Sequence, residues 1–513
     1  MTETPVTRPV RRGPEHRRHP DNGDGTFRNP ILAGDRPDPA VVRVGEDYYL
    51  THSSFDSAPG LTIWHSRDLV NWRYLTDALP TPLSTVFAPD FIHHQGRFYI
   101  YIPFIPAPWS TAITEPEIHV IVADDPRGPW SEPRPTGIRG AIDPGHAVGE
   151  DGRRYLFTNG IRRAPLDDAG LRATGPLEQV YDGWRYPDEW ITEAYALEGP
   201  KIFRRDDWFY LVSAVGGTAG PPTGHMVIVA RSRSIDGPWE NSPGNPVTRT
   251  WHTDESWWSR GHATIIDAAD DSWWMVSHGY ENGFRTLGRQ ILLEPIEWTP
   301  DGWPVAPAAD LGADLPKLRP DDPAAESPAA SDDFSAPAWG TRWSLEDTVP
   351  AARSRARFGD ALSLAAVGGS PADSPPMAIR ATERAYAVEV EVEVSPGASG
   401  ALLLYFSPRL FCGMAWDGTR MTSYAGGVAT HWREPVTPGD RLRLRLVNDG
   451  HIVTGWHAAP GGEWRRHGVR YDTSGYHAAT MQDLKSLRPA LCAFGRGDVR
   501  FTDFRHIAFE ETT

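Results

Sequence analysis

The chain has 513 residues, 40% of them hydrophobic, which is enough for two or three domains with well-filled cores. Its formal net charge of −16 argues against a nucleic-acid partner, because binding phosphate groups requires clustered Lys and Arg. No run approaches the roughly 18 consecutive apolar residues of a membrane helix, so we expect no membrane partner either.

The N-terminal segment has the composition of a polar tail. It is rich in Arg and Pro and lacks the apolar stretch of a secretory signal. We therefore expect residues 1–25 to be a flexible tail and the protein to be cytoplasmic. The two cysteines, Cys412 and Cys492, lack the spacing of metal ligands, so neither a zinc site nor a disulfide scaffold is predicted.

Five segments between residues 26 and 318 share one pattern, which is a strand, a polar turn and a second strand rich in aromatic residues. The separations between the start of the pattern and an aromatic residue of the second strand are 11, 11, 12, 12 and 12 residues, from Asp38 to Tyr49, Ala88 to Tyr99, Asp143 to Tyr155, Glu198 to Tyr210 and His262 to Trp274. A β unit of about 50 to 60 residues that recurs in this way is typical of a propeller blade. We predict a five-bladed β-propeller over residues 26–318; a β-sandwich with chance similarity among its segments is the alternative.

The remainder of the chain predicts a second β domain. Residues 319–333 are rich in Pro, Ala and Ser, which is typical of a linker. Beyond them, Val and Glu alternate over residues 388–394, so that the valines would face a core and the glutamates solvent. Residues 334–513 are therefore predicted to form a β-sandwich of the concanavalin-like type, and the whole chain is expected to be all-β.

Equivalent positions at the starts of the innermost strands of a propeller converge near its axis. Here those positions hold Asp38, Ala88, Asp143, Glu198 and His262. Three carboxyl groups and an imidazole would then face one small cavity, which is electrostatically costly and typical of a functional site. Paired carboxyl groups cleave glycosidic bonds, because one protonates the leaving oxygen while the other activates water or attacks the sugar directly.

Each of these residues also has a structural explanation, since an Asp before Pro commonly caps a turn. The segment before Glu198 adds three further carboxyl groups, those of Asp188, Glu189 and Glu193. We prefer Glu198 as the acid, because it begins the repeated strand, whereas the other three lie in the preceding loop.

The chain resembles glycoside hydrolase family 43, in particular its two-domain β-xylosidases and α-L-arabinofuranosidases. The resemblance rests on RPDPAVV at Asp38, IDPG at Asp143, EGPKIF at Glu198, SRGHATIID at His262 and LGRQILLEP at Arg289, in that order along the chain. It implies an inverting, exo-acting hydrolase that releases terminal xylose or arabinose from oligosaccharides derived from hemicellulose or pectin.

The resemblance also implies a role for each site residue. Asp38 is similar to the general base, Glu198 to the general acid, and Asp143 to the residue that modulates the pKa of the acid and orients it. Arg289 resembles a sugar-binding arginine, and His262 resembles a channel histidine that contacts calcium or water in part of the family. His262 as an ordinary core histidine and Arg289 as a structural arginine stay open as alternatives.

Two aromatic residues, Phe55 and Trp64, are expected to form walls of the sugar pocket, although aromatic residues on strands more often fill cores. The chemistry is expected to need no cofactor, while a structural calcium ion in the channel stays open. The expected partner is a small oligosaccharide, and self-association into a homo-oligomer is left open.

Two other functions compete with this interpretation. A retaining enzyme of the fructan hydrolase type would share the propeller and sandwich, but its usual WMNDP and EC motifs are absent from the sequence. A noncatalytic sugar-binding propeller would lack a complete acid and base pair. The choice between xylose and arabinose, and the linkage that is cleaved, stay open.

Overall fold

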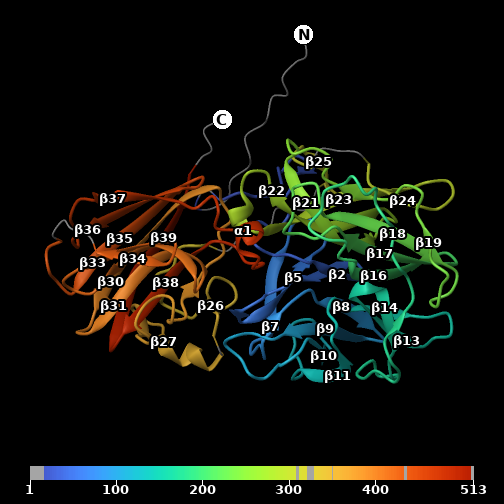
Figure 1. The fold of residues 1–513 in the computed structure, drawn as a ribbon, viewed down its shortest axis with the longest axis horizontal. Coiled ribbons are helices and arrows are strands. Elements are labelled where there is room, and N and C mark those ends of the chain that lie inside the picture. The colour runs from blue at the N-terminus through green and yellow to red at the C-terminus, as the bar shows by residue number, and fades with distance from the viewer. Residues whose placement is uncertain are drawn as a thin grey trace, which may run out of the picture.

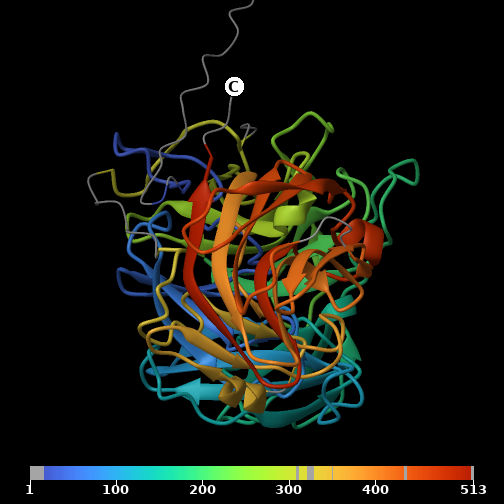
Figure 2. The same ribbon diagram turned by 90° about the vertical axis from the view of Figure 1, so that its left-hand side faces the viewer.

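The computed structural model describes residues 15, 17–307, 311–320, 329–348, 350–431 and 436–509. Two strand-rich bodies lie side by side, a propeller coloured blue to yellow and a sandwich coloured orange to red (Figure 1). In the view turned by 90°, the sandwich covers one side of the propeller (Figure 2). The predicted all-β fold, with a five-bladed propeller followed by a sandwich, is confirmed.

Five antiparallel sheets form the blades, and each begins with a strand at the propeller centre. The first blade contains β2 (Ala40–Val44), β3 (Asp47–Thr51), β5 (Gly60–Ser66) and β6 (Arg73–Leu79). The second contains β7 (Thr85–Val86), β8 (Asp90–His94), β9 (Arg97–Ile105), β10 (Glu117–Ala123) and β11 (Arg134–Arg139). The third contains β12 (Gly145–Val148), β13 (Arg154–Thr158), β14 (Arg162–Pro165) and β15 (Glu178–Gln179). The fourth contains β16 (Glu198–Arg205), β17 (Trp208–Val215), β18 (Met226–Ser232), β19 (Glu240–Asn241) and β20 (Thr248–Arg249). The fifth contains β21 (Trp257–Asp267), β22 (Trp273–Glu281), β23 (Arg289–Trp298) and β24 (Pro304–Val305).

The polar turn in each repeat joins the first two strands of a blade. Each turn has a Gly or Asp in the left-handed conformation, which Gly adopts freely and Asp tolerates: Gly45, Gly96, Gly152, Asp206 and Asp271, joined in the second turn by Gln95. This turn lets the second strand pair directly with the first. The repeated spacing in the sequence therefore reflects one hairpin built five times.

Alternate side chains of the second strands fill the two gaps on either side of a blade. In the second blade, Tyr99 and Tyr101 pack toward the third blade, whereas Phe98 and Ile100 pack toward the first. Corresponding clusters fill the gaps between the other neighbouring blades. Because both faces of each blade are buried, these strands are continuously apolar instead of alternating with polar residues.

The chain closes the propeller by returning to its own beginning. Strand β1 (Thr26–Phe27) pairs antiparallel with β25 (Leu315–Pro316), which follows the fifth blade. The Asn29 side chain adds two hydrogen bonds to the backbone of Leu293 in β23, at 3.0 and 2.8 Å. The start of the predicted propeller range is thus held against its last blade.

Part of the predicted N-terminal tail packs against the domains. Arg18 forms an ion pair with Glu281 at 2.7 Å, and Asp21 forms one with Lys317 at 2.6 Å, all four with buried side chains. The described part of this tail is therefore held by ion pairs to the folded body. Residues 1–14 and 16 of the predicted tail, and residues 321–328 of the predicted linker, lie outside the described residues.

The sandwich consists of two packed antiparallel sheets. One contains β34 (Val428–His431), β33 (Met421–Ala425), β32 (Leu410–Trp416), β31 (Ala398–Ser407), β38 (Arg488–Gly495), β29 (Met377–Ala378), β26 (Ser344–Glu346) and β4 (Ser57–Ala58). The other contains β27 (Ala356–Arg357), β28 (Leu362–Ala365), β39 (Asp498–Ala508), β30 (Ala385–Val394), β35 (Arg441–Asp449), β36 (Ile452–Ala458) and β37 (Arg465–Asp472). The valines predicted to face the core over residues 388–394 are buried, and Glu391 and Glu393 are partly exposed. Glu389, which was expected to face solvent, is buried instead, where it pairs with Arg445 on β35 at 2.6 Å.

The two domains share a sheet. Strand β4 lies in the sequence between two strands of the first blade, yet it pairs with β26 of the sandwich. Next to it, Lys485 of the sandwich lies 2.7 Å from Asp56 and 2.5 Å from Asp347, with all three side chains largely buried. The short helix α1 (Ala478–Met481) lies at this junction (Figure 1). The segment that carries Phe55 is thereby held by the sandwich.

Replacing Lys485 with Met should lower the free energy of unfolding by about 3 to 5 kcal/mol, because two buried carboxylates lose their shared cation. The control is Arg97→Met, which removes an exposed ion pair to Asp124 and should cost less than about 1 kcal/mol. Urea unfolding of both variants tests this, and equal losses would contradict a structural role for the buried pair.

Candidate active site

The predicted site residues lie at or near the starts of the inner strands. Asp38 and Asp143 stand two residues before β2 and β12, Glu198 is the first residue of β16, and His262 lies within β21. Neighbouring inner strands contact one another around the ring. The fold therefore brings together residues that are more than 200 positions apart in the sequence.

The backbone at these positions is strained. Asp38, Asp143 and His262 have φ values of 60°, 56° and 49°, in the left-handed region that side chains disfavour. Such a residue costs on the order of 1 to 3 kcal/mol and persists where the surrounding structure enforces it. The strain recurs at three matching positions of the propeller, which indicates that the direction of these side chains matters.

Irregular pairing also directs Glu198 and His262. The register of β16 with β17 shifts between Glu198 and Lys201, and that of β21 with β22 shifts between Gly261 and Thr264. Such bulges re-aim side chains beside active sites. Gly261 is required at the second bulge, because a Cβ there would lie 2.2 Å from the ring of His225.

Asp38 is buried and fully bound by its neighbours. Its Oδ1 accepts a hydrogen bond from Arg289 at 3.0 Å, and its Oδ2 accepts one from the Ser53 hydroxyl at 2.5 Å. The backbone N–H of Asp38 donates to Nδ1 of His278 at 3.0 Å, which leaves the proton of that imidazole on Nε2, near Thr218. The contacts fix both the position and the charge of the carboxylate.

The charges around Asp38 determine its ionisation. Burial alone would raise the pKa of Asp38, but the Arg289 guanidinium brings it well below the ordinary value. Asp38 is therefore ionised over the whole neutral range. A permanently ionised carboxylate can accept a proton from water but cannot serve as a proton donor.

Asp143 shows the opposite behaviour in the same cavity. Burial, followed by the nearby carboxyl groups of Glu198 and Asp38, raises the pKa of Asp143 well above the ordinary value. Its Oδ2 accepts a hydrogen bond from the Gly199 N–H at 3.1 Å, directly beside Glu198. Asp143 and Glu198 are therefore coupled electrostatically and through one backbone link.

Glu198 is the most accessible of the three carboxyl groups, with a side chain 24% exposed. Its Oε1 lies 3.4 Å from Nε2 of the fully buried His225. By comparison, the alternative residues Asp188, Glu189 and Glu193 are exposed in the preceding loop, where Glu193 accepts a hydrogen bond from the backbone of Ala219. The geometry therefore favours Glu198 over these three residues as the second carboxyl group of the candidate site.

His262 lies against Asp38, with its Nδ1 3.6 Å from Oδ1. Burial lowers the pKa of His262 to about 4, although Asp38 and Glu198 oppose this shift. The imidazole is therefore neutral at pH 7. Its Nε2 is buried and has no hydrogen-bond partner among the described residues.

The predicted sugar-binding residues differ in their placement. Arg289 is buried beside Asp38, and its guanidinium carbon lies 5.6 Å from the centre of the Phe55 ring, so both belong to the site. Trp64 instead packs in the core between the fifth and first blades, with Tyr74 edge-on and Arg36 over its ring. The structure does not group Trp64 with the carboxyl residues, because its strand position directs the ring into the gap between blades.

Four contact residues were missed by the sequence analysis: Ser53, Lys201, His225 and His278. Lys201 lies in the EGPK motif itself, and His225 immediately precedes the third strand of the fourth blade, so both stand at marked places in the repeat. Ser53 and His278 have no such marker, since each follows or belongs to an apolar strand.

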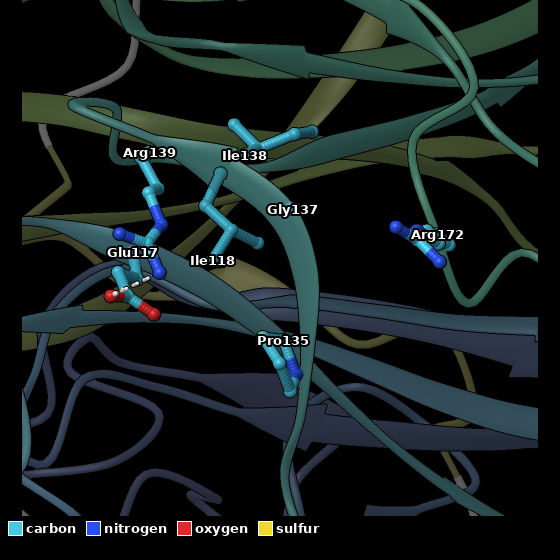
Figure 3. Close-up of a pocket in the computed structure, with 7 residues that line it drawn as sticks. All are labelled: Glu117, Ile118, Pro135, Gly137, Ile138, Arg139 and Arg172. Atoms are coloured by element: carbon cyan, nitrogen blue, oxygen red, sulfur yellow. Dashed lines mark ion pairs between the residues drawn. The ribbon is translucent and has the colours of Figure 1, made fainter.

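No cluster of three or more His, Cys, Asp or Glu side chains suited to a metal ion occurs within the described ranges. In the same part of the chain, none of the helices has the length and apolar character needed to cross a membrane. Figure 3 shows a pocket of about 300 Å³ over the outer strands β10 and β11, where Arg139 faces Glu117. The predicted site residues do not line this pocket, which is separate from the channel.

Comparisons with known proteins place the chain among carbohydrate-active enzymes. A sequence profile described as glycosyl hydrolases family 43 matches residues 27–304. A xylan 1,3-β-xylosidase of a Vibrio species is 32% identical over 54% of this chain, and a non-reducing end α-L-arabinofuranosidase of Bacteroides ovatus is 33% identical over 54%. These alignments cover 57% and 53% of the two relatives, so the chain matches a little over half of their length.

Solved structures match almost the whole chain. A GH43 protein from Bacillus licheniformis superposes with a TM-score of 0.81 at 25% identity, covering 94% of this chain and all of that one. A xylan β-1,4-xylosidase from Bacillus halodurans gives the same TM-score at 24% identity. The arrangement of propeller and sandwich is thus shared with these proteins.

Titration of His262 tests the electrostatics of the site directly. We expect its imidazole to stay neutral at pH 6 and to protonate only near pH 4, because burial disfavours the charged form. Nitrogen NMR of labelled protein measures this, with the signal assigned from the spectrum of a His262→Gln variant. A titration midpoint near pH 6.5 would contradict the burial of the His262 imidazole.

Proposed function

The chain belongs to glycosyl hydrolases family 43, and we propose that it is an inverting, exo-acting glycoside hydrolase that releases terminal pentose units from plant oligosaccharides. The observation that carries this proposal is the arrangement of three carboxyl groups: Arg289 binds the buried Asp38, the buried Asp143 forms no ion pair among the described residues, and Glu198 beside them is partly exposed. A site that contains both an acid and a base needs carboxyl groups in such different environments, because their pKa values must differ.

Asp38 is the proposed general base. Its carboxylate removes a proton from a water molecule as the water oxygen bonds to the anomeric carbon. Arg289 and Ser53 hold the carboxylate in place and keep it ionised. Room for this water requires the carboxyl groups of Asp38 and Glu198 to stand about 6.5 to 9.5 Å apart, which stays a prediction for a complex with bound sugar.

Glu198 is the proposed general acid. It gives its proton to the glycosidic oxygen as the bond from that oxygen to the anomeric carbon breaks. Asp143 is coupled to Glu198 and linked to it through the Gly199 amide, which supports a role for Asp143 as the residue that modulates and orients the acid. Partial exposure of Glu198 allows it to take up a new proton from solvent after each turnover.

Arg289 and Phe55 are the proposed sugar contacts. The second guanidinium nitrogen of Arg289, Nη2, is buried without a hydrogen-bond partner among the described residues. A sugar hydroxyl would satisfy it, since buried donors are rarely left unpaired. Phe55 packs against Arg289 and against Phe87, which gives the cavity an apolar wall beside the charged group.

The proposed substrates are β-D-xylosides and α-L-arabinofuranosides, in agreement with the activities named for the relatives. The test is hydrolysis of nitrophenyl β-D-xyloside, nitrophenyl α-L-arabinofuranoside and arabinan, with product analysis. Release of single pentoses from the ends supports the proposal. Binding of oligosaccharides without cleavage would favour the noncatalytic alternative, and release of fructose from fructans would favour the fructan hydrolase alternative.

Replacing Glu198 with Ala should reduce kcat on natural oligosaccharides by about 10²- to 10⁴-fold, because their leaving groups need a proton. Activity on a nitrophenyl pentoside should fall far less, since nitrophenolate leaves without protonation. Steady-state kinetics on both substrates measures the difference. Asp188→Ala, in the preceding loop, is the control and should retain the activity of the unmodified enzyme; equal losses on both substrates would exclude Glu198 as the acid.

Replacing Asp143 with Asn should move the alkaline limb of the pH dependence of kcat/KM to lower pH. A pair of neighbouring carboxyl groups resists losing its last proton, because two negative charges would then repel each other, and the neutral amide of Asn abolishes this repulsion. The acidic limb, which reports the base Asp38, should move less, since Arg289 still stabilises that carboxylate. An unchanged alkaline limb would contradict the coupling.

A further inference from the structure

Lys201 occupies the centre of the propeller with oxygen atoms around its ammonium group. The Nζ atom lies 2.7 Å from Oδ1 of Asp90, 3.0 Å from the Pro89 carbonyl oxygen and 3.3 Å from the Pro144 carbonyl oxygen. The lysine and the aspartate are both largely buried. The other carboxylate oxygen of Asp90 accepts a hydrogen bond from the backbone N–H of His146 at 2.7 Å.

Lys201 and its partners come from three different blades. Asp90 begins β8 of the second blade, Pro144 immediately precedes β12 of the third, and Lys201 itself lies in β16 of the fourth. Pro144 is the neighbour of Asp143, and Lys201 stands across the bulge from Glu198. One ammonium group therefore joins the two strands that carry the coupled carboxyl groups.

The donor set resembles that of a calcium site. Calcium takes carboxylate and backbone carbonyl oxygens, which are the atoms that surround Nζ here. Because Lys201 already fills the centre of these oxygens with a positive charge, a divalent cation at the same place would meet electrostatic repulsion. The oxygen atoms around Nζ thus fit an ammonium group, and with Lys201 present they do not fit calcium.

We propose that the Lys201 ammonium acts as the channel cation of this propeller in place of a metal ion, and that it is a positioning residue for Asp143 and Glu198. The catalytic part of this statement rests on the proposed function, whereas the part about the cation does not. Burial, Glu198 and Asp38 raise the pKa of Asp143. The hydrogen bond from the Gly199 amide and the positive charge of Lys201 lower it.

The first experiment uses the unmodified enzyme. After dialysis against EDTA, the protein should contain less than about 0.1 equivalent of calcium and keep its unfolding temperature and its kcat/KM within twofold. Added calcium should change neither quantity. Loss of activity or stability on dialysis, with recovery by calcium, would overturn the proposal.

The second experiment removes the charge. Lys201→Met should lower kcat by about 10- to 100-fold through misplacement of the acid, with a smaller change in KM. It should also move the alkaline limb of the pH profile upward, opposite to the shift expected for Asp143→Asn, because a positive charge near Asp143 is lost. A profile of unchanged shape would contradict the positioning role.

Lys317 provides the matched control, since its buried ammonium pairs with Asp21 at 2.6 Å outside the channel. Lys317→Met should lower the unfolding temperature and leave the shape of the pH profile unchanged. A similar shift of the alkaline limb in both variants would show that Lys201→Met acts through general destabilisation, and it would overturn the proposal.

The third experiment restores the charge to a truncated side chain. Lys201→Ala should regain unfolding temperature, and with it activity, when methylammonium is added, whereas tetramethylammonium is too large to bind among the oxygens. Failure of methylammonium to restore either quantity would overturn the proposal. If the unmodified enzyme proves inactive on all pentosides, the proposed function fails, but metal content and unfolding temperature still test the role of Lys201 as the channel cation.

Discussion

Repulsion among buried carboxyl groups governs the centre of this propeller. Removing an ionised carboxylate from water costs several kcal/mol unless a partner compensates for the loss. Asp38 has such a partner in Arg289, and Asp90 has one in Lys201. Among the described residues, no cation forms an ion pair with Asp143, so its pKa is raised and it stays closest to the neutral form. Because the cations are unequally distributed, neighbouring carboxyl groups in the centre of the propeller differ in their pKa.

The propeller fold places the carboxyl groups and their cationic partners close together. Five similar hairpins place their first strands around one axis, and apolar clusters between the blades keep these strands from moving apart. Left-handed backbone conformations at Asp38, Asp143 and His262 then turn the side chains as required. The sandwich contributes by binding Asp56, next to Phe55, through Lys485, so the second domain also supports one wall of the site.

The fold and the convergence of Asp38, Asp143 and Glu198 could be predicted because a repeat of constant spacing determines which positions are equivalent, and equivalent positions lie close together near the axis. Lys201 was missed because its position carries a lysine in one blade alone, so comparing repeats does not reveal its partners in the others. Trp64 was expected at the sugar pocket but packs between two blades. The sequence does not show whether an aromatic residue on a strand faces a ligand pocket or the core. The pairing of Lys485 with Asp56 joins residues more than 400 positions apart and follows no local pattern.

In the proposed mechanism, Asp38 directs water to the side of the sugar opposite the departing group. Proton NMR during cleavage of a nitrophenyl pentoside identifies the anomer that is released before mutarotation. We expect the inverted anomer, which is α-xylose from a β-D-xyloside, because a single displacement by water inverts the configuration. First release of the anomer with the configuration of the substrate would contradict it, since retention requires a covalent intermediate and a nucleophilic carboxylate.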